Sequence, residues 1–204
     1  MKLSPLILSL FLSCICLHAQ EQKGRVPEFT FGVEWGYVAT LHYGYHNNFF
    51  SPEGNRIDRR DNVIGLFNNA DAYLHAGYNI NHQWNISSYI GWAGLADSQS
   101  IIPISIRATR YFGDNHLTDR WLCFADVGSG ISIKKHPQEI LTGKLGGGYR
   151  VSLSRISKLD FIASVRITYS HENINHYGYM IEPEYINRNN IYASALSLGL
   201  SLTF

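Results

Sequence analysis

The stretch IYASALSLGLSLTF, from Ile191 to Phe204, alternates between large apolar residues and small, weakly polar ones. Successive side chains of a β-strand point to opposite faces, so this alternation predicts one strand of about a dozen residues. Strands of globular proteins usually have about five or six residues. The large series forms one apolar face and consists of Leu196, Leu198, Leu200, Leu202 and Phe204.

Seven further segments show the same period of two. Their predicted ranges are 29–41, 70–80, 84–92, 102–109, 121–133, 141–153 and 159–169. No linker divides them into domains, and helical periodicity is hard to find. Charged residues make up only 16% of the chain and the net charge is +1, so the composition does not suggest nucleic-acid binding.

The face opposite the apolar one, which we call the minority face, indicates which kind of β protein these segments form. A strand of a soluble sandwich turns a face rich in Lys, Glu and Asp to water, whereas here that face holds Gly, Ser, Thr, Ala and isolated charges. Such a face suits the crowded interior of a narrow eight-stranded barrel. The apolar face, at about 9–11 residues, is long enough to cross a bilayer at a tilt. We therefore predict an all-β fold, a transmembrane antiparallel up-and-down β-barrel, with a soluble lipocalin-like barrel or sandwich as the alternative.

Aromatic residues fall near the ends of the predicted strands, as expected of interfacial girdles in membrane barrels. One predicted band consists of Phe29, Phe31, Trp84, Tyr111, Phe112, Trp121, Tyr149, Phe161 and Phe204. The other consists of Tyr43, Tyr45, Trp92, Tyr169 and Tyr192.

The first residues have the layout of a secretory signal peptide. Lys2 precedes an apolar run from Leu6 to Leu17 that is too short to span a bilayer, and Ala19 precedes a polar stretch. We predict a cleaved signal over residues 1–19, a short periplasmic segment over 20–27 and a barrel domain over 28–204. A retained anchor helix and lipoprotein processing at Cys14 are alternatives; cleavage after Ala19 would leave Cys123 as the remaining cysteine.

The connections between strands are unequal in length. With both termini in the periplasm, the external connections are residues 43–67, 96–100, 134–140 and 171–190, and the periplasmic ones are 81–83, 113–120 and 154–158. Long external loops and short inner turns are typical of outer-membrane barrels, with 96–100 and 113–120 as exceptions. The first loop is predicted to form a hairpin above the membrane with a turn at Ser51-Pro52-Glu53-Gly54.

With these features the chain resembles the small eight-stranded outer-membrane barrels of Gram-negative bacteria, of the OmpA and OmpX type, a porin-like class. The resemblance covers most of the chain after the signal and lies in its pattern of strands. It implies location in the outer membrane and a last strand that is recognised by the barrel-assembly machinery. The residues that match this signal are Leu198, Leu200, Leu202 and Phe204.

The minority face also carries charges, which are costly to bury unless they are paired. We therefore predict a polar network that fills and blocks the lumen, with a narrow proton or ion path as the alternative. The predicted members are Glu34, Asp71, His75, Arg107, Asp126, Lys144, Arg150 and Arg166.

The sequence favours a non-enzymatic surface protein whose external loops serve structure, adhesion or ligand recognition. A lipid A deacylase of this membrane is the enzymatic alternative, and its His-Tyr-Ser-Asn run resembles Thr168-Tyr169-Ser170-His171 here. Thr168 occupies the place of the catalytic histidine, and His171 follows Ser170 directly, so the strand would turn the two side chains apart. We predict no catalytic residue.

Binding partners are predicted from the loops and the barrel surface. The arginines at positions 56, 59 and 60 either contact lipopolysaccharide phosphates or form local salt bridges with Asp58 and Asp61. The last loop contains His171, Glu172, His176, Glu182 and Glu184 without the tight spacing of a metal site, so we expect no metal and no cofactor. The expected partners are outer-membrane lipid and lipopolysaccharide, the barrel-assembly machinery and an extracellular ligand.

Overall fold

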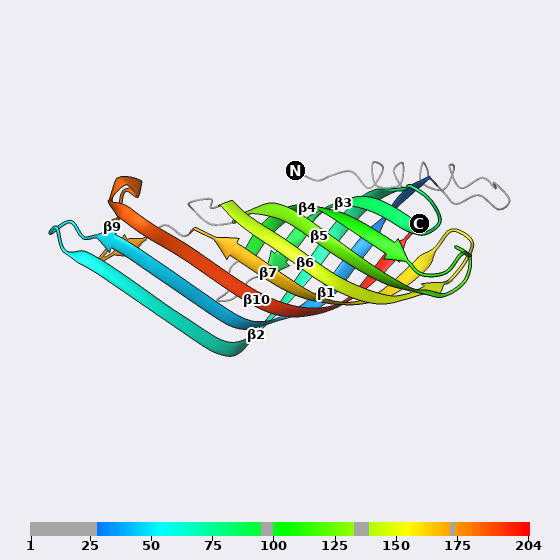
Figure 1. Cartoon of the computed structure of the whole chain (residues 1–204), viewed down its shortest axis with the longest axis horizontal. Coiled ribbons are helices and arrows are strands. Elements are labelled where there is room, and N and C mark those ends of the chain that lie inside the picture. The colour runs from blue at the N-terminus through cyan, green and yellow to red at the C-terminus, as the bar shows by residue number, and fades with distance from the viewer. Residues whose placement is uncertain (1–27, 95–99, 133–138, 172–173) are drawn as a thin grey trace, which may run out of the picture.

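The computed structural model describes residues 28–94, 100–132, 139–171 and 174–204. Eight antiparallel strands close into a barrel in the order β1-β10-β7-β6-β5-β4-β3-β2. Figure 1 shows the barrel from the side. This confirms the predicted all-β, eight-stranded up-and-down barrel. The barrel strands are β1 (Phe29–Phe50), β2 (Arg56–Asn79), β3 (Trp84–Gly94), β4 (Ser100–Tyr111), β5 (Arg120–Ser132), β6 (Glu139–Ser152), β7 (Lys158–Ser170) and β10 (Ile186–Thr203).

The segment between β7 and β10 has secondary structure that the sequence pattern did not predict. It contains the two-stranded sheet of β8 (Asn175–His176) and β9 (Tyr179–Met180), followed by the 3-10 helix η1 (Pro183–Tyr185). In the described ranges, no helix is both long enough and apolar enough to cross a membrane. The predicted signal peptide and the predicted segment 20–27 lie outside the described residues.

The register of the strands makes the barrel narrow and strongly tilted. A ladder of paired residues that starts at Ile101 in β4 travels once around the barrel and returns to β4 at Tyr111, ten residues further along. For eight strands such a shift corresponds to a tilt of about 40° and an interior that side chains fill. The ladder passes through Ala93, Asp71, Gly36, Gly199, Ile162, Gly148 and Leu122.

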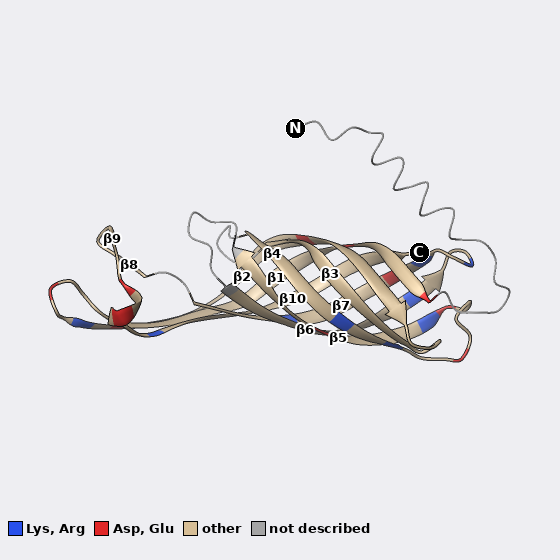
Figure 2. Cartoon of the chain, turned by 90° about the horizontal axis from the view of Figure 1, so that it is seen from above, with Lys and Arg blue, Asp and Glu red and all other residues tan. Residues whose placement is uncertain are grey.

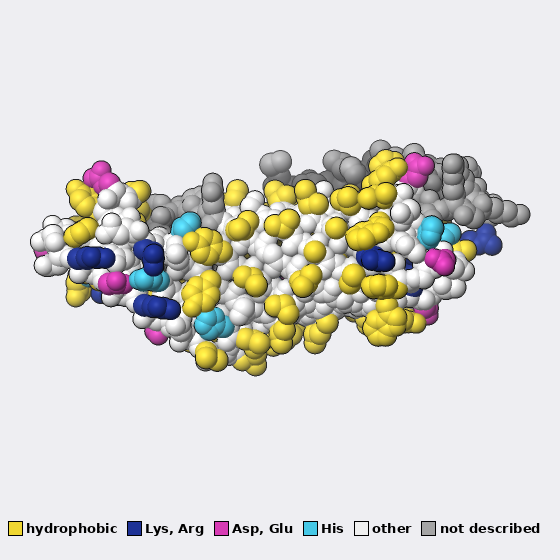
Figure 3. Space-filling model, in the orientation of Figure 1, with side chains coloured by type: hydrophobic (Ala, Val, Ile, Leu, Met, Phe, Trp, Pro, Cys, Tyr) yellow, Lys and Arg dark blue, Asp and Glu magenta, His cyan; other side chains and the backbone are white. Residues whose placement is uncertain are grey.

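Alternation along the strands separates a polar interior from an apolar wall. Figure 3 shows hydrophobic side chains spread over the wall of the barrel, which is a surface for lipid rather than for water. Exposed apolar residues occur on each of the eight strands, including Trp35, Leu74, Ile86, Ile104, Val127, Leu145, Ile167 and Leu198.

Three members of the predicted aromatic bands are corrected by the structure: Tyr43 and Tyr45 follow a β-bulge at Leu41 and lie on the inward side of β1, as Phe49 does, and the third is Tyr111. Tyr111 is buried in the lumen, where its ring lies between the guanidinium groups of Arg120 and Arg150 at 4.2 Å from each. The adjacent residue, Phe112, is exposed on the wall instead. The sequence prediction counted both as girdle residues, although neighbouring strand residues face opposite sides.

Three strands continue from the barrel into a sheet that we call the extension: residues 42–50 of β1, 56–64 of β2 and 186–194 of β10, of which residues 191–194 still pair with β7. Figures 1 and 2 show it projecting from one end as a thin layer. Along residues 56–70, β2 pairs with β1 alone among the described strands. The barrel end that carries this sheet is the extension end, and the opposite end, with short connections, is the turn end.

β1 and β2 join at a tight turn over residues 51–55. The backbone N–H of Ser51 donates to the carbonyl of Asn55 at 2.8 Å, and Gly54 has a φ of +82°, which favours glycine. A hydrogen bond from Ser51 lowers the pKa of the exposed Glu53 carboxyl. The hairpin that the sequence predicted for the first loop, with its turn at residues 51–54, is therefore confirmed.

A β-bulge at Leu41 separates the extension from the barrel. Thr40 pairs with Ala195 of β10 and His42 pairs with the next residue, Ser194, so Leu41 is an extra residue in β1. Because of this bulge, the even-numbered residues of β1 face the lumen below Leu41 and face outward above it.

Candidate functional site: the closed lumen and the extension

Arg107 of β4 is the centre of the lumen network. Its Nη1 and Nη2 donate to the two carboxylate oxygens of Glu34 at 2.6 and 3.0 Å, and its Nε donates to Asp126 Oδ2 at 3.1 Å. The guanidinium carbon also lies 4.0 Å from the ring centroid of Tyr89 and 4.2 Å from that of Phe124. One side chain that is 2% exposed thus links four strands: β1, β3, β4 and β5.

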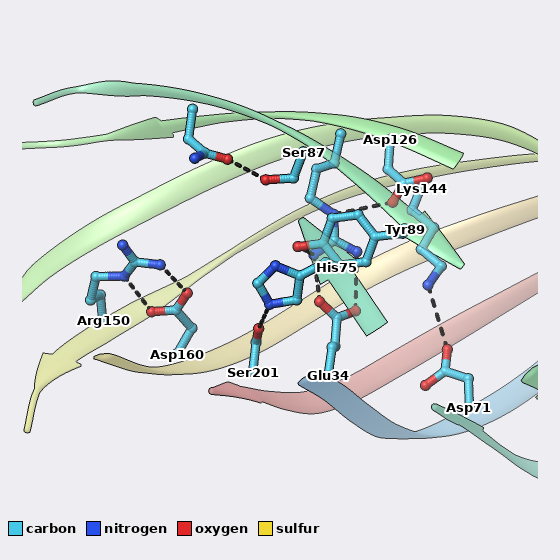
Figure 4. Close-up of polar contacts among 12 residues, drawn as sticks. Glu34, Asp71, His75, Ser87, Tyr89, Asp126, Lys144, Arg150, Asp160 and Ser201 are labelled. Carbon is cyan, nitrogen blue, oxygen red and sulfur yellow. Dashed lines mark hydrogen bonds and ion pairs between the residues drawn. The ribbon is translucent and has the colours of Figure 1, made fainter. Parts of the chain in front are cut away.

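A second ion pair lies toward the turn end of the lumen. The Nε and Nη2 groups of Arg150 donate to the two oxygens of Asp160 at 2.6 and 2.7 Å, which is a bidentate pair (Figure 4). Arg120 lies beside it and donates to the carbonyl of His82 at 2.5 Å. Asp160 and Arg120 were not predicted as members of the network, although both continue the inward series of their strands.

A third group lies toward the extension end. Lys144 Nζ is 3.5 Å from Asp71 Oδ2, and Arg166 Nη1 is 3.7 Å from the same oxygen. Arg166 Nη2 donates to the carbonyl of Gly94 at 2.8 Å, and Lys144 lies 4.0 Å from the ring centroid of Tyr73. Two cations therefore share one carboxylate in this part of the lumen.

His75 belongs to the network through its ring rather than through an ion pair. It stacks on Tyr89 with 4.9 Å between centroids, and its Nε2 lies 3.3 Å from Ser201 Oγ (Figure 4). Ser201 is 2% exposed and faces a filled interior, so this Ser-His pair offers no access to a substrate. The structure thus places all eight residues of the predicted network in the lumen.

These side chains leave little free space. The cavity between His75, Arg107 and Arg150 has a volume of about 20 Å³. One water molecule needs at least ~10–15 Å³ measured in this way, so the cavity has room for about one. The lumen at this level is therefore filled.

A filled lumen predicts the electrical behaviour of the protein. In planar bilayers the purified full-length chain should show no stable conductance of porin size, because ions would have to displace the Arg107 and Arg150 pairs. Single-channel recording beside a sixteen-stranded porin, whose lumen is an aqueous channel, makes the comparison. Stable open channels of the porin type would contradict the closed lumen.

The extension has two different faces. Its inward face is covered by the segment that contains β8 and β9, which buries Phe49 against Ile174 and Ile181. Its outward face carries the exposed apolar side chains of Phe50 and Ile64 beside polar ones: Asp58 accepts a hydrogen bond from Asn48 at 2.9 Å and lies 2.9 Å from His46 Nε2. The first loop is therefore an ordered surface with a small core of its own.

The deacylase-like run does not form a catalytic pair. Ser170 is buried on the inward side of β7, whereas the exposed His171 ring packs on Tyr169 at 5.1 Å and contacts the carbonyl of Asn189. In the part of the chain that the structure describes, no hydrogen bond joins Ser170 to a histidine. The same described ranges hold no cluster of three or more His, Cys, Asp or Glu side chains that could bind a metal.

A narrow barrel with an apolar wall and a charged, filled interior has the architecture of a membrane-spanning β-barrel. Searches of family models and of curated proteins return no match. Among solved structures, the chain is similar to OprG of Pseudomonas aeruginosa, with 11% identity, a TM-score of 0.49 and coverage of 90% of this chain and 99% of that one. It is also similar to neisserial surface protein A, with 15% identity, a TM-score of 0.46 and coverage of 85% of this chain and 97% of that one. For Ail of Yersinia pestis the identity is 14%, the TM-score is 0.35, and the coverage is 87% of this chain and 100% of that one.

Proposed function

We propose that the protein is a non-enzymatic outer-membrane surface protein that uses its barrel as an anchor and its extension as the working surface. The observation that supports this most is the contrast between the two parts: the lumen is filled by ion pairs, while three strands continue beyond the lipid-facing wall. A channel would need an open lumen, and a lipid-modifying enzyme would need an oriented nucleophile at the surface.

The proposed orientation places the extension outside the cell and the turn end in the periplasm. Short turns at one end and long elements at the other are the usual asymmetry of outer-membrane barrels. After removal of residues 1–19, residues 20–27 would be a periplasmic segment before β1. The last strand would carry the assembly signal at Leu198, Leu200, Leu202 and Phe204.

The proposed partners follow from this placement. The apolar wall contacts outer-membrane lipid, and the extension lies at the level of lipopolysaccharide headgroups and above. The covered inward face, with its β8–β9 sheet, and the exposed side chains of η1 form a surface for adhesion or for an extracellular ligand.

Limited proteolysis of intact cells tests the orientation. A protease of broad specificity should cut at the exposed turn residues Pro52, Glu53 and Asn55 and in the exposed 3-10 helix over residues 183–185. It should spare the turns at 113–119 and 153–157, because these would lie in the periplasm. Peptide mapping by mass spectrometry locates the cuts.

Permeabilised cells provide the control for this experiment. Once the periplasm is accessible, the turns at 113–119 and 153–157 should become sensitive as well. Cleavage of these two turns in intact cells, with the turn at 51–55 protected, would reverse the orientation and contradict the proposed function.

A further inference from the structure

The outward wall of the barrel is hollowed near the turn end. A groove with a volume of about 850 Å³ crosses β5, β6, β7, β10 and β1. Its floor includes two small outward-facing residues, Gly147 and Ala163, which pair with each other. A cross-strand ladder of larger residues borders the floor on the side of the turn end: Trp121, Tyr149, Phe161, Leu200 and Trp35.

The groove rises obliquely from the turn end toward the middle of the barrel. Its floor follows a ladder of paired residues from Gly147 through Ala163 and Leu198 to Tyr37. Four steps between strands lead from β5 to β1, and at about 4.8 Å each they give a length of about 19 Å. With strands tilted by about 40°, the ladder climbs about 12 Å along the barrel axis. One leaflet of a bilayer core is about 15 Å thick, so the groove fits within the leaflet at the turn end.

The lining of the groove suits a hydrocarbon chain rather than a polar ligand. It consists of aliphatic side chains, aromatic rings and the backbone of glycines. At the lower end, the rings of Trp121 and Tyr149 pack edge to face with 5.0 Å between their centroids. The indole N–H and the phenol O–H are hydrogen-bond donors, and rings of this kind lie at the level of lipid headgroups and ester groups.

An arginine lies in line with the lower end of the groove. The floor ladder continues from Gly147 to Cys123 of β5 and then to Arg110 of β4. The exposed guanidinium of Arg110 contacts the rings of Trp84 and Phe112, at 5.6 Å from each centroid. It therefore lies at the level of the turn-end aromatic residues, where the phosphates of that leaflet are expected.

The charge of Arg110 can serve a ligand. Within the described ranges, no carboxylate lies within ion-pair distance of its guanidinium. Asp114 of the turn between β4 and β5 accepts a hydrogen bond from Gln83 at 3.1 Å instead. Asp119 of the same turn accepts one from the backbone N–H of Ser152 at 2.8 Å. Guanidinium groups bind phosphate oxygens in a bidentate manner, so a lipid phosphate is a suitable partner.

We propose that the groove binds one glycerophospholipid of the leaflet at the turn end. An acyl chain lies over Gly147 and Ala163, and the headgroup phosphate contacts Arg110. The proposed orientation makes this the periplasmic leaflet, but the site exists whichever end of the barrel is outside the cell. A second copy fits the surface less well, because a two-fold contact through the groove would place hollow against hollow and leave an unfilled space.

The headgroup half of the site is tested with purified full-length protein in a maltoside detergent. Native mass spectrometry should detect one phosphatidylglycerol bound to each barrel. A galactosyl diacylglycerol with the same acyl chains has no phosphate and should bind about fivefold more weakly. Arg110→Gln should weaken the binding of phosphatidylglycerol about three- to fivefold, as expected for loss of a partly hydrated ion pair, and should leave the galactolipid unchanged. Arg60→Gln is the matched control, because Arg60 is an exposed arginine of the extension.

The groove half is tested by filling it. Ala163→Leu should lower the occupancy of both lipids about tenfold, because the added side chain displaces methylene groups of the acyl chain. Ala76→Leu should have no such effect, because Ala76 is exposed on β2 and does not line the groove. The electrophoretic shift between folded and heat-unfolded protein verifies that each variant forms the barrel.

Four results would overturn the inference. Equal binding of phosphatidylglycerol and the galactolipid would remove the phosphate contact, and equal loss with Arg110→Gln and Arg60→Gln would reduce it to general charge attraction. Unchanged occupancy in Ala163→Leu would place the lipid elsewhere on the wall. A dimer that Ala163→Leu dissociates would assign the groove to a second copy. These results leave the proposed function intact, whereas proteolysis that reversed the orientation would contradict the proposed function and leave the lipid site intact.

Discussion

Replacing Arg107 with alanine should reduce the free energy of unfolding of the barrel by about 3–5 kcal/mol, the cost of removing one partner from a buried ion pair. The guanidinium donates three hydrogen bonds to Glu34 and Asp126, so its loss leaves two carboxylates in an interior with room for about one water. Its contacts with Tyr89 and Phe124 disappear as well. Urea titration of folding into lipid vesicles measures the difference.

Arg110→Ala is the matched control for this measurement. Arg110 lies on the same strand, but it faces outward, and its ring contacts are with Trp84 and Phe112 at 5.6 Å each. Its replacement should cost less than about 1 kcal/mol, as for an exposed cation–π contact. If the two variants lose equal stability, the ion pairs of Arg107 do not stabilise the barrel more than an exposed contact does. If adding Glu34→Gln to the Arg107→Ala variant restores part of the lost stability, the unpaired carboxylate of Glu34 causes that part of the loss.

Phe204→Ala should lower the amount of protein in the outer membrane about tenfold, equivalent to ~1.4 kcal/mol of recognition by the assembly machinery. The backbone of Phe204 pairs with that of Phe31 through two hydrogen bonds of 3.1 and 2.8 Å, which alanine preserves. The lost ring contact with Phe31, at 6.4 Å between centroids, costs only about 1 kcal/mol in folding. Quantitative immunoblotting of outer-membrane fractions measures the amount of protein in the membrane. Refolding in lipid vesicles measures the change in folding free energy.

The control removes the other ring of the same pair. Phe31→Ala loses the same stacking contact but leaves the last residue unchanged, so it should refold as poorly as Phe204→Ala while reaching the outer membrane in nearly normal amounts. Equal membrane levels of the two variants would mean that Phe204 acts by packing and not as an assembly signal.

The barrel was predictable because period-two alternation determines which side chains face inward. The sequence placed Glu34, Arg107 and Asp126 on the lumen side, since each lies between outward-facing apolar residues. It did not show that one guanidinium would join the two carboxylates, because that depends on the register of β1, β4 and β5. Pairing between strands distant in the chain is set by closure of the whole barrel.

The parts that escaped prediction lie where alternation is interrupted or weak. Lys158 fell in the predicted turn 154–158, and Asp160 lies at the start of the predicted strand 159–169 but was not counted among the inward charges; both are buried in the lumen. The β8–β9 sheet depends on long-range burial of Phe49 rather than on a local pattern.

Because of the bulge at Leu41, substitutions in the two parts of β1 face different constraints. Below it, even-numbered positions of β1 must suit a crowded interior of fixed shape, and a change at Glu34 affects side chains on other strands. Above it, the even-numbered positions His42 and His46 are on the outward face, where substitutions meet solvent and other molecules. The outer sheet can therefore diversify quickly among descendants of this chain while the interior stays nearly constant, with position 41 as the boundary between them.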